Sequence, residues 1–187
     1  IGLQVRNPGD LYLYSNNNLQ AVKIKGADLK AWLETSAKQF GQIDPASTAE
    51  QDLVPSYGTI YNYDVFYAES NALRYQIDVT KKPGSRIVNL TYKGAAVADG
   101  DDFIVATNDY RAGGGGAVPG IDGSKTIIKS PDANQAVVSN YLASLSTKAG
   151  KVTLAANGSA RSWSFVKTAT AGPVILRSAP GHLALAQ

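Results

Sequence analysis

Residues 20–41 read QAVKIKGADLKAWLETSAKQFG, and the hydrophobic period of this stretch changes at Gly26. Before the glycine, Gln20 to Lys25 alternates apolar and polar residues, which predicts a half-buried strand. After the glycine we expect an amphipathic helix, with Asp28 as its cap and Gly41 at its end. The apolar face of that helix is expected to hold Leu29, Trp32, Leu33, Ala37 and Phe40. A strand that runs directly into a helix favours helices packed on sheet.

The rest of the chain is rich in strand-like segments. Residues 10–14 alternate as a strand does, whereas residues 46–58 are polar and predict a loop. The short apolar run 103–107 is expected to be a central strand. Further strands are predicted at 60–67, 75–79, 86–92, 163–167 and 174–177, and turns at 82–85 and 93–94.

A second helix is predicted to begin at Ser130, with Pro131 at its first position and Gly150 at its end. Its apolar face would comprise Val137, Val138, Tyr141, Leu142 and Leu145. The pattern therefore predicts an α+β fold, in which mixed sheets carry a few packed helices. The length fits one domain over residues 1–187.

The composition excludes several kinds of protein. The 187 residues include no cysteine and one histidine, so disulfides, thiolate zinc sites and multi-histidine metal sites are excluded. A formal net charge of +3 is too small to indicate a nucleic-acid polymer or a membrane surface as partner. No stretch approaches the roughly 20 apolar residues of a membrane helix. Because the chain begins at Ile1 without a methionine, we expect a fragment or a processed product.

No catalytic constellation is expected. A Ser–His–acid triad would need His182, which lies five residues before the end of the chain and is predicted to be a surface residue. The acidic cluster of Asp99, Asp101 and Asp102 lacks the loop length and terminal glutamate of an EF-hand and predicts a solvated turn.

Four consecutive glycines, Gly113 to Gly116, follow the apolar run. They lack a phosphate-loop motif, so their predicted role is steric: the backbone can approach a bulky group where no Cβ intrudes. Tyr110 stands beside them, and Tyr14 holds a similar place at a predicted strand end. Two such rings could sandwich a flat ligand, and Asn16 could read the edge of a base. The alternative is that both tyrosines are ordinary packing residues.

Several stretches together resemble a known family. Residues 11–16 (LYLYSN) and 22–26 (VKIKG) resemble the start of the C-terminal domain of the bacterial 5′-nucleotidase family. Residues 32–45 (WLETSAKQFGQIDP) look like one branch of it, the periplasmic 2′,3′-cyclic-nucleotide 2′-phosphodiesterase/3′-nucleotidases. The resemblance continues in order through 61–65, 75–80, 86–92 and 106–115, and covers roughly residues 8–178.

The resemblance implies a division of labour between two domains. It implies that an N-terminal metallophosphoesterase domain of the same polypeptide holds two divalent metals and the catalytic groups, and that this chain holds no cofactor. It further implies that the base of a nucleotide or nucleoside lies between Tyr14 and Tyr110, with Asn16 at its edge. The whole enzyme would be periplasmic or exported and would open 2′,3′-cyclic nucleotides before removing the 3′-phosphate, whereas this chain alone would be inactive.

Some positions depart from the family pattern. In the 5′-nucleotidase branch an aspartate that contacts the ribose follows the glycines, and Gly116 stands there in this chain. Gln42, Asp44 and Gly113 are expected as further lining of the pocket, whereas no substrate arginine is carried over to Arg6 or Arg111. Two alternatives stay open: a 5′-nucleotidase or nucleotide-sugar hydrolase domain of the same family, or a surface module without an enzyme that binds a sugar or a polymer.

Overall fold

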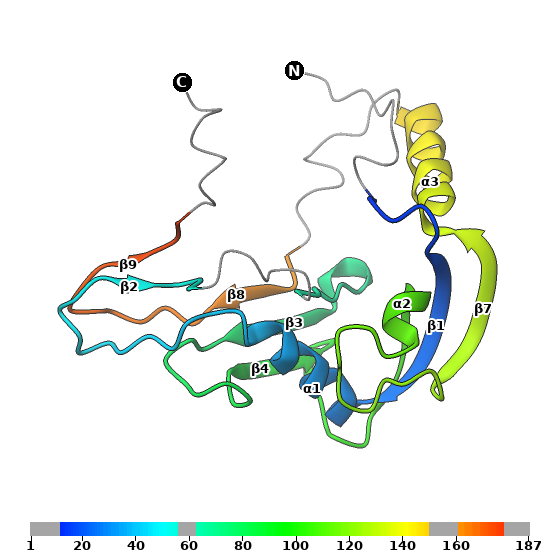
Figure 1. Ribbon diagram of the computed structural model, residues 1–187. Coiled ribbons are helices and arrows are strands. Elements are labelled where there is room, and N and C mark those ends of the chain that lie inside the picture. Colours follow the sequence, from blue (N-terminus) through cyan, green and yellow to red (C-terminus); the bar gives the residue numbers. More distant parts are fainter. Residues whose placement is uncertain (1–11, 56–62, 150–160, 178–187) are drawn as a thin grey trace. The chain divides into compact units, whose positions relative to one another are not determined.

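The computed structural model describes residues 12–55, 63–149 and 161–177 (Figure 1). The chain divides into two compact units, each built from two separate stretches. The first unit comprises Ile1–Lys25 and Gly100–Ala160, and the second comprises Gly26–Asp99 and Arg161–Gln187. The change of period at Gly26 therefore coincides with the passage from one unit to the other.

The first unit is a three-stranded antiparallel sheet with two helices. Its strands are β1 (Asn18–Lys25), β6 (Asp102–Asn108) and β7 (Thr126–Ala133), in the order β6-β1-β7, and β1 and β7 run side by side in Figure 1. Val22 and Ile24 are buried whereas Lys23 and Lys25 are exposed, which confirms the alternation predicted for β1. The prediction that 103–107 is central is wrong, because β1 pairs on both sides and leaves β6 at an edge.

The two helices of this unit are α2 (Asp109–Ala112) and α3 (Asn134–Ala149). The predicted helix start at Ser130 is wrong, because β7 pairs with β1 as far as Ala133. The Ser130 hydroxyl binds the Asp132 carboxylate at 2.9 Å instead of capping a helix. Pro131 fits this arrangement because β7 is an edge strand, where a missing N–H is tolerated. Gly150, the predicted end, lies outside the described residues.

The predicted apolar face of α3 is only partly covered. Tyr141 is 60% exposed. The other four predicted members of that face are half-buried, namely Val137, Val138, Leu142 and Leu145. Tyr141 therefore does not contribute to a core in this unit.

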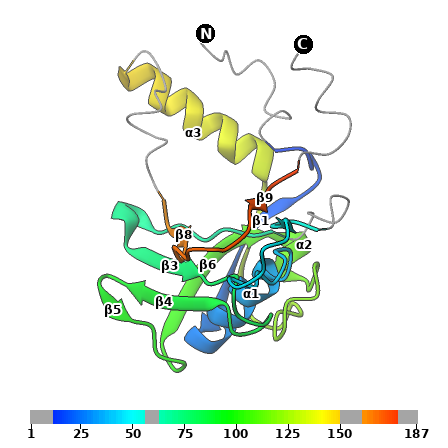
Figure 2. The same ribbon diagram turned by 90° about the vertical axis from the view of Figure 1, so that its left-hand side faces the viewer.

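The second unit contains a mixed sheet, and α1 packs against it (Figure 2). Its four strands lie in the order β5-β4-β3-β8, with β8 parallel to β3 and the other pairs antiparallel. The bounds are α1 (Gly26–Ala37), β3 (Leu73–Ile77), β4 (Ile87–Tyr92), β5 (Ala95–Ala96) and β8 (Trp163–Phe165). A parallel pair of short strands, β2 (Gln51–Asp52) and β9 (Val174–Ile175), and the 3₁₀ turn η3 (Glu69–Asn71) complete the unit.

The predictions for the second unit hold for most of its elements. The strands predicted at 75–79, 86–92, 163–167 and 174–177 correspond to β3, β4, β8 and β9. Four predicted apolar positions of α1 are at most 2% exposed: Leu29, Trp32, Leu33 and Ala37. The turn at 82–85 is closed by a hydrogen bond from the Ser85 N–H to the Lys82 carbonyl.

Several local predictions are wrong. The helix begins at Gly26, so Asp28 lies in its first turn instead of capping it, and Phe40 lies beyond its end. Residues 63–67 form no strand, and residues 60–62 lie outside the described part. The predicted loop 46–58 contains β2. Of the strand predicted at 10–14, residues 10–11 lie outside the described part and residues 12–14 are not a strand, so Tyr14 precedes β1 instead of ending a strand.

Candidate functional site

The two predicted stacking tyrosines emerge at the same end of the sheet in the first unit. Because β1 and β6 are antiparallel, the start of β1 lies beside the end of β6, where Leu19 pairs with Asn108. Tyr14 precedes β1 by four residues, and Tyr110 lies in α2 directly after β6. A hydrogen bond of 3.2 Å from the Asn18 N–H to the Asp109 carboxylate joins the two segments.

Neither tyrosine belongs to a core. Tyr14 and Tyr110 are each 54% exposed, so both rings present surface to solvent. Asn16 follows Tyr14 in an exposed turn, which leaves its amide accessible to solvent. An exposed aromatic ring beside an exposed amide offers both a stacking face and a donor–acceptor pair.

The glycine run shapes the surroundings of Tyr110. The backbone of Gly115 lies so close to the Tyr110 ring that a Cβ there would be 2.5 Å from ring atoms, which confirms the predicted steric role at this position. Gly114 and Gly116 have φ angles of 102° and 85°, a conformation that other residues rarely adopt. Gly113 ends α2, and its N–H binds the Asp109 carbonyl at 2.9 Å.

Arg111 holds the glycine turn in place. Its side chain is buried, and its Nη1 donates to the Gly115 carbonyl at 3.1 Å. The guanidinium carbon also lies 5.3 Å from the centroid of the Tyr110 ring, within the range of a cation–π contact. Arg111 therefore fixes the turn against which the Tyr110 ring packs.

Sequence reasoning missed Tyr12, whose hydroxyl lies at the centre of a hydrogen-bonded cluster. The amide nitrogens of Asn17, Asn108 and Asn134 lie 3.2, 2.9 and 3.1 Å from its oxygen. Gln135 Nε2 donates to the Tyr12 carbonyl at 2.7 Å. The only local sequence signal was the LYLY run itself, because two of the asparagines are 96 and 122 residues away.

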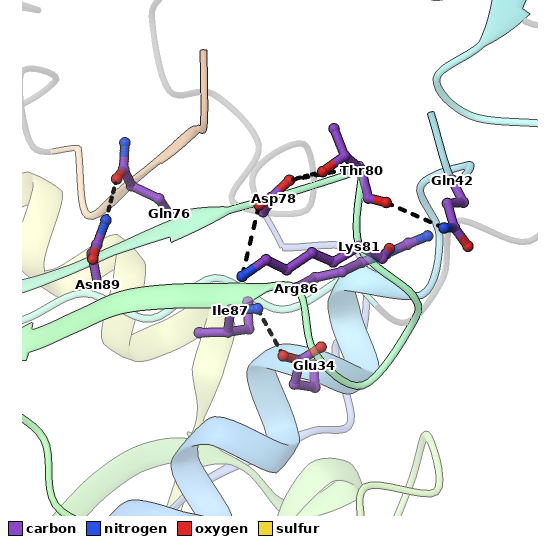
Figure 3. Close-up of polar contacts among 9 residues, drawn as sticks. All are labelled: Glu34, Gln42, Gln76, Asp78, Thr80, Lys81, Arg86, Ile87 and Asn89. Carbon is purple, nitrogen blue, oxygen red and sulfur yellow. Dashed lines mark hydrogen bonds and ion pairs between the residues drawn. The ribbon is translucent and has the colours of Figure 1, made fainter. Parts of the chain in front are cut away.

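Gln42 and Asp44 belong to the second unit, where both make local contacts. Gln42 Nε2 donates to the Thr80 carbonyl at 3.2 Å, as Figure 3 shows. The Asp44 carboxylate accepts a hydrogen bond from the Ala46 N–H at 2.9 Å, and Gln51 binds both backbone groups of Asp44. Both residues are exposed. That they and Gly113 line the nucleoside pocket stays a prediction.

The second unit also contains a buried pair of ionisable residues, Glu34 and Arg86 (Figure 3). Arg86 donates to the carbonyls of Ala37 and Phe40 at 2.8 and 2.6 Å, and the Glu34 carboxylate accepts from the Ile87 N–H at 2.7 Å. Burial lowers the pKa of Arg86, and the nearby Glu34 charge acts in the opposite direction. Because Arg86 binds the carbonyls at the end of α1, it joins that helix to the sheet.

Acidic side chains do not gather into a metal site in the part of the chain that the structure describes. Asp102 binds Lys25 at 2.7 Å and lies 3.6 Å from Lys23. The hydrogen bond from Lys25 is the main cause that lowers the pKa of Asp102. Asp99 lies in a turn, as predicted, and His182 lies outside the described residues. None of the helices in the described ranges is both long and apolar enough to cross a membrane.

Comparison with known proteins shows the family of the chain. The family model described as the C-terminal domain of 5′-nucleotidase matches residues 10–122. The trifunctional nucleotide phosphoesterase protein YfkN of Bacillus subtilis is 40% identical over 75% of this chain and 10% of that protein. The 2′,3′-cyclic-nucleotide 2′-phosphodiesterase/3′-nucleotidase of Haemophilus influenzae is 39% identical over 88% of this chain and 26% of that protein. The chain thus spans about a quarter or less of the length of these two relatives.

Solved structures agree on the fold. A protein of Staphylococcus aureus described as a 5′-nucleotidase superposes with a TM-score of 0.62 at 23% identity, over 75% of this chain and 27% of that one. A 5′-nucleotidase precursor of Thermus thermophilus gives a TM-score of 0.53 at 15% identity, over 95% and 28%. Together with the mixed sheets and few helices, these matches confirm the predicted α+β fold. The chain belongs to the family of 5′-nucleotidase C-terminal domains, and its curated relatives include 2′,3′-cyclic-nucleotide 2′-phosphodiesterase/3′-nucleotidases.

Proposed function

We propose that this chain is the nucleoside-binding domain of a periplasmic 2′,3′-cyclic-nucleotide 2′-phosphodiesterase/3′-nucleotidase. The base stacks between Tyr14 and Tyr110, and the amide of Asn16 reads its edge. One observation carries the proposal: two half-exposed tyrosine rings lie at the same end of one sheet, on segments joined by the Asn18–Asp109 hydrogen bond. Stacking on aromatic rings is worth about 1–3 kcal/mol per base.

In this proposal the chain contributes binding and orientation. The catalytic groups and two divalent metals are assigned to an N-terminal domain of the same polypeptide, where the metals would activate a water for attack on phosphorus. Tyr14 and Tyr110 bind the base, which is the part of the substrate remote from the reacting phosphate. The bound base then fixes the orientation in which the phosphate is presented to the N-terminal domain. Binding energy from a remote part of the substrate then helps to orient the reacting group.

Titration calorimetry with adenosine and with 3′-AMP tests the stacking. The unaltered chain is expected to bind both ligands, and Tyr110→Ala should weaken binding by about 1–3 kcal/mol because one stacking face is lost. Tyr141→Ala is the matched control, because Tyr141 is a similarly exposed tyrosine on α3 of the same unit. Equal binding by Tyr110→Ala and the unaltered chain, or no binding at millimolar ligand, would contradict the proposal.

A second measurement tests the division of labour. The isolated chain, supplied with Mg²⁺ or Mn²⁺, should not hydrolyse a 2′,3′-cyclic nucleotide, because the catalytic groups are assigned to another domain. Turnover that depends on the added metal and persists after repeated purification would contradict this part of the proposal.

A groove in the second unit favours a second candidate function, the binding of a sugar or polymer without an enzyme. The groove has a volume of about 550 Å³. Polar side chains of the outer sheet surface line it beside Trp163, among them Arg74, Gln76, Asn89, Thr91 and Ser164. Asn89 Nδ2 donates to Gln76 Oε1 at 2.7 Å, as Figure 3 shows. If Asn89→Ala abolished binding of a soluble oligosaccharide while adenosine did not bind, this candidate would replace the first.

A further inference from the structure

We infer that Tyr12 is a positioning residue for the nucleoside site, because it links the loop of Tyr14 to the turn of Tyr110. The inference rests on the proposed function. It concerns a residue that stacks on no ligand itself and acts through the two tyrosines that do.

The first link is a ring contact between Tyr12 and Tyr14. The ring centroids lie 6.4 Å apart, and the planes meet at 78°, so the contact is edge to face. Such a geometry is favourable for aromatic pairs and limits the orientations that the partner ring adopts. Tyr14 nevertheless stays 54% exposed, so this contact leaves much of its surface available for a base.

The second link is the Tyr12 hydroxyl. Its three amide partners come from three different segments: Asn17 from the loop before β1, Asn108 from the end of β6, and Asn134 from the start of α3. All three partners are amide N–H donors and a phenol oxygen has two lone pairs, so the hydroxyl oxygen accepts from at most two of the three amides at a time. The hydroxyl therefore ties together segments that lie up to 122 residues apart in sequence.

The third link runs from Asn108 to the turn of Tyr110. Asn108 is the N-cap of α2, and its Oδ1 accepts a hydrogen bond of 2.7 Å from the Arg111 N–H. The Nδ2 of the same amide lies 2.9 Å from the Tyr12 hydroxyl oxygen. One asparagine side chain thus connects Tyr12 directly to the helical turn that carries Tyr110.

These three links determine how far apart the two stacking rings are held before a ligand arrives. A site whose walls are held in advance loses less conformational freedom when the ligand binds. Removal of the Tyr12 hydroxyl should therefore weaken nucleoside binding although no ligand contact is deleted. The start of α3 belongs to the same network through Asn134 and Gln135.

The test is the dissociation constant of adenosine, measured by titration calorimetry or ligand-detected NMR on the 187-residue chain. Tyr12→Phe keeps the ring contact and removes the hydroxyl, and it should weaken binding by about threefold to tenfold, the range of one net hydrogen bond. Tyr141→Phe, which removes a hydroxyl from an exposed tyrosine of the same unit, should leave the constant unchanged.

A double-mutant cycle separates positioning from general destabilisation. If Tyr12 acts by positioning Tyr14, the effect of Tyr12→Phe should shrink to within about twofold when Tyr14→Ala is already present. If Tyr12→Phe weakened adenosine binding by the same factor in the unaltered chain and in the Tyr14→Ala variant, the inference would be overturned, because Tyr12 would then act independently of the Tyr14 ring. Should Tyr12→Phe fail to fold by circular dichroism, Asn17→Ala releases the same loop with the phenol in place and enters the same cycle.

The outcomes for the two proposals differ. Absence of adenosine binding by the unaltered chain contradicts the proposed function and overturns this inference with it. Binding by the unaltered chain with an equal constant for Tyr12→Phe overturns the role of Tyr12 alone and leaves the proposed function standing. If Tyr12→Phe weakens adenosine binding in the unaltered chain but has no further effect when Tyr14→Ala is present, the result supports both the proposed function and the role of Tyr12.

Discussion

The two units differ in how their aromatic clusters are built. In the second unit the rings pack edge-on against each other at centroid distances of 5.0–5.8 Å, in a cluster of Phe40, Tyr63, Trp163 and Phe165 and a separate pair of Trp32 and Phe66. In the first unit Tyr14 and Tyr110 are more than half exposed, and hydrogen bonds of neighbouring amides hold their segments. Aromatic content alone therefore does not distinguish the two units; Tyr14 and Tyr110 differ in combining exposure with polar anchoring of their segments.

The units also differ in what their buried polar groups support. In the second unit Arg86 and Glu34 bind backbone groups and join α1 to the sheet. In the first unit Arg111 binds the carbonyl of Gly115 and thereby supports the turn beside an exposed ring. If this contrast is correct, changes in the second unit should lower stability, whereas changes around Tyr110 should lower binding.

The largest effect is expected for Arg86→Met in the second unit. The change removes the hydrogen bonds of Arg86 to the carbonyls of Ala37 and Phe40 and takes away the cation that interacts with the buried Glu34, so the free energy of unfolding should fall by about 3–5 kcal/mol. Urea denaturation followed by circular dichroism measures it. Lys30→Met on the exposed side of α1 is the control and should change the value by at most about 0.5 kcal/mol. If the free energy of unfolding fell by a similar amount in Arg86→Met and in Lys30→Met, the buried cation would be no more important for stability than the exposed one.

A smaller effect is expected for Gly115→Ala, and it should appear in ligand binding and not in stability. The new methyl group would lie 2.5 Å from the Tyr110 ring, and because this ring is exposed it can move aside. Stability should change by at most about 1 kcal/mol, while adenosine binding should weaken because the ring is displaced. Gly100→Ala, where nothing lies within 4 Å, is the control. Unchanged adenosine binding by Gly115→Ala would show that the ring position is not part of the site.

The smallest effect concerns alkaline pH and two tyrosines of the second unit, the buried Tyr75 and the half-buried Tyr63. Burial is the main cause that raises the pKa of Tyr63 and of Tyr75 above the ordinary value near 10. The folded state therefore keeps both phenols neutral when the unfolded state begins to lose its protons. Their contribution to stability is complete below pH 10 and is lost as the pH rises above it.

Ultraviolet absorbance of phenolate measures this effect during a pH titration. Tyr63→Phe and Tyr75→Phe should each remove absorbance from the late part of the titration of the folded chain. Tyr67→Phe, which alters an exposed tyrosine of the same unit, is the matched comparison. If Tyr63→Phe or Tyr75→Phe instead removed absorbance from the early part of the pH titration, the pKa of that tyrosine would not be raised in the folded chain.

The sequence predicted the elements whose pattern is local. The alternation before Gly26 and the helical spacing after it identified β1 and α1, because a strand and a helix each bury one face at a fixed period. The predicted start of α3 at Ser130 is wrong, because the pairing of β7 with β1 overrides the local preference of Ser130 for a helix cap. Residues 63–67 alternate but form no strand, and Tyr63 and Phe66 contact other aromatic rings instead.

The candidate site was predictable to a similar extent. The glycines pointed to a bulky neighbour, and Gly115 indeed lies against Tyr110. The family resemblance indicated Tyr14, Asn16 and Tyr110 as a group. The role of Tyr12 could not be predicted, because its partners Asn108 and Asn134 are distant in sequence and nothing in the local pattern marks them.

A crystal structure of the chain with adenosine tests the central claim most directly. The base is expected to lie between the rings of Tyr14 and Tyr110, with the two rings roughly 7 Å apart and the amide of Asn16 at the edge of the base. Adenosine bound elsewhere on the chain, or a base in contact with neither ring, would contradict it.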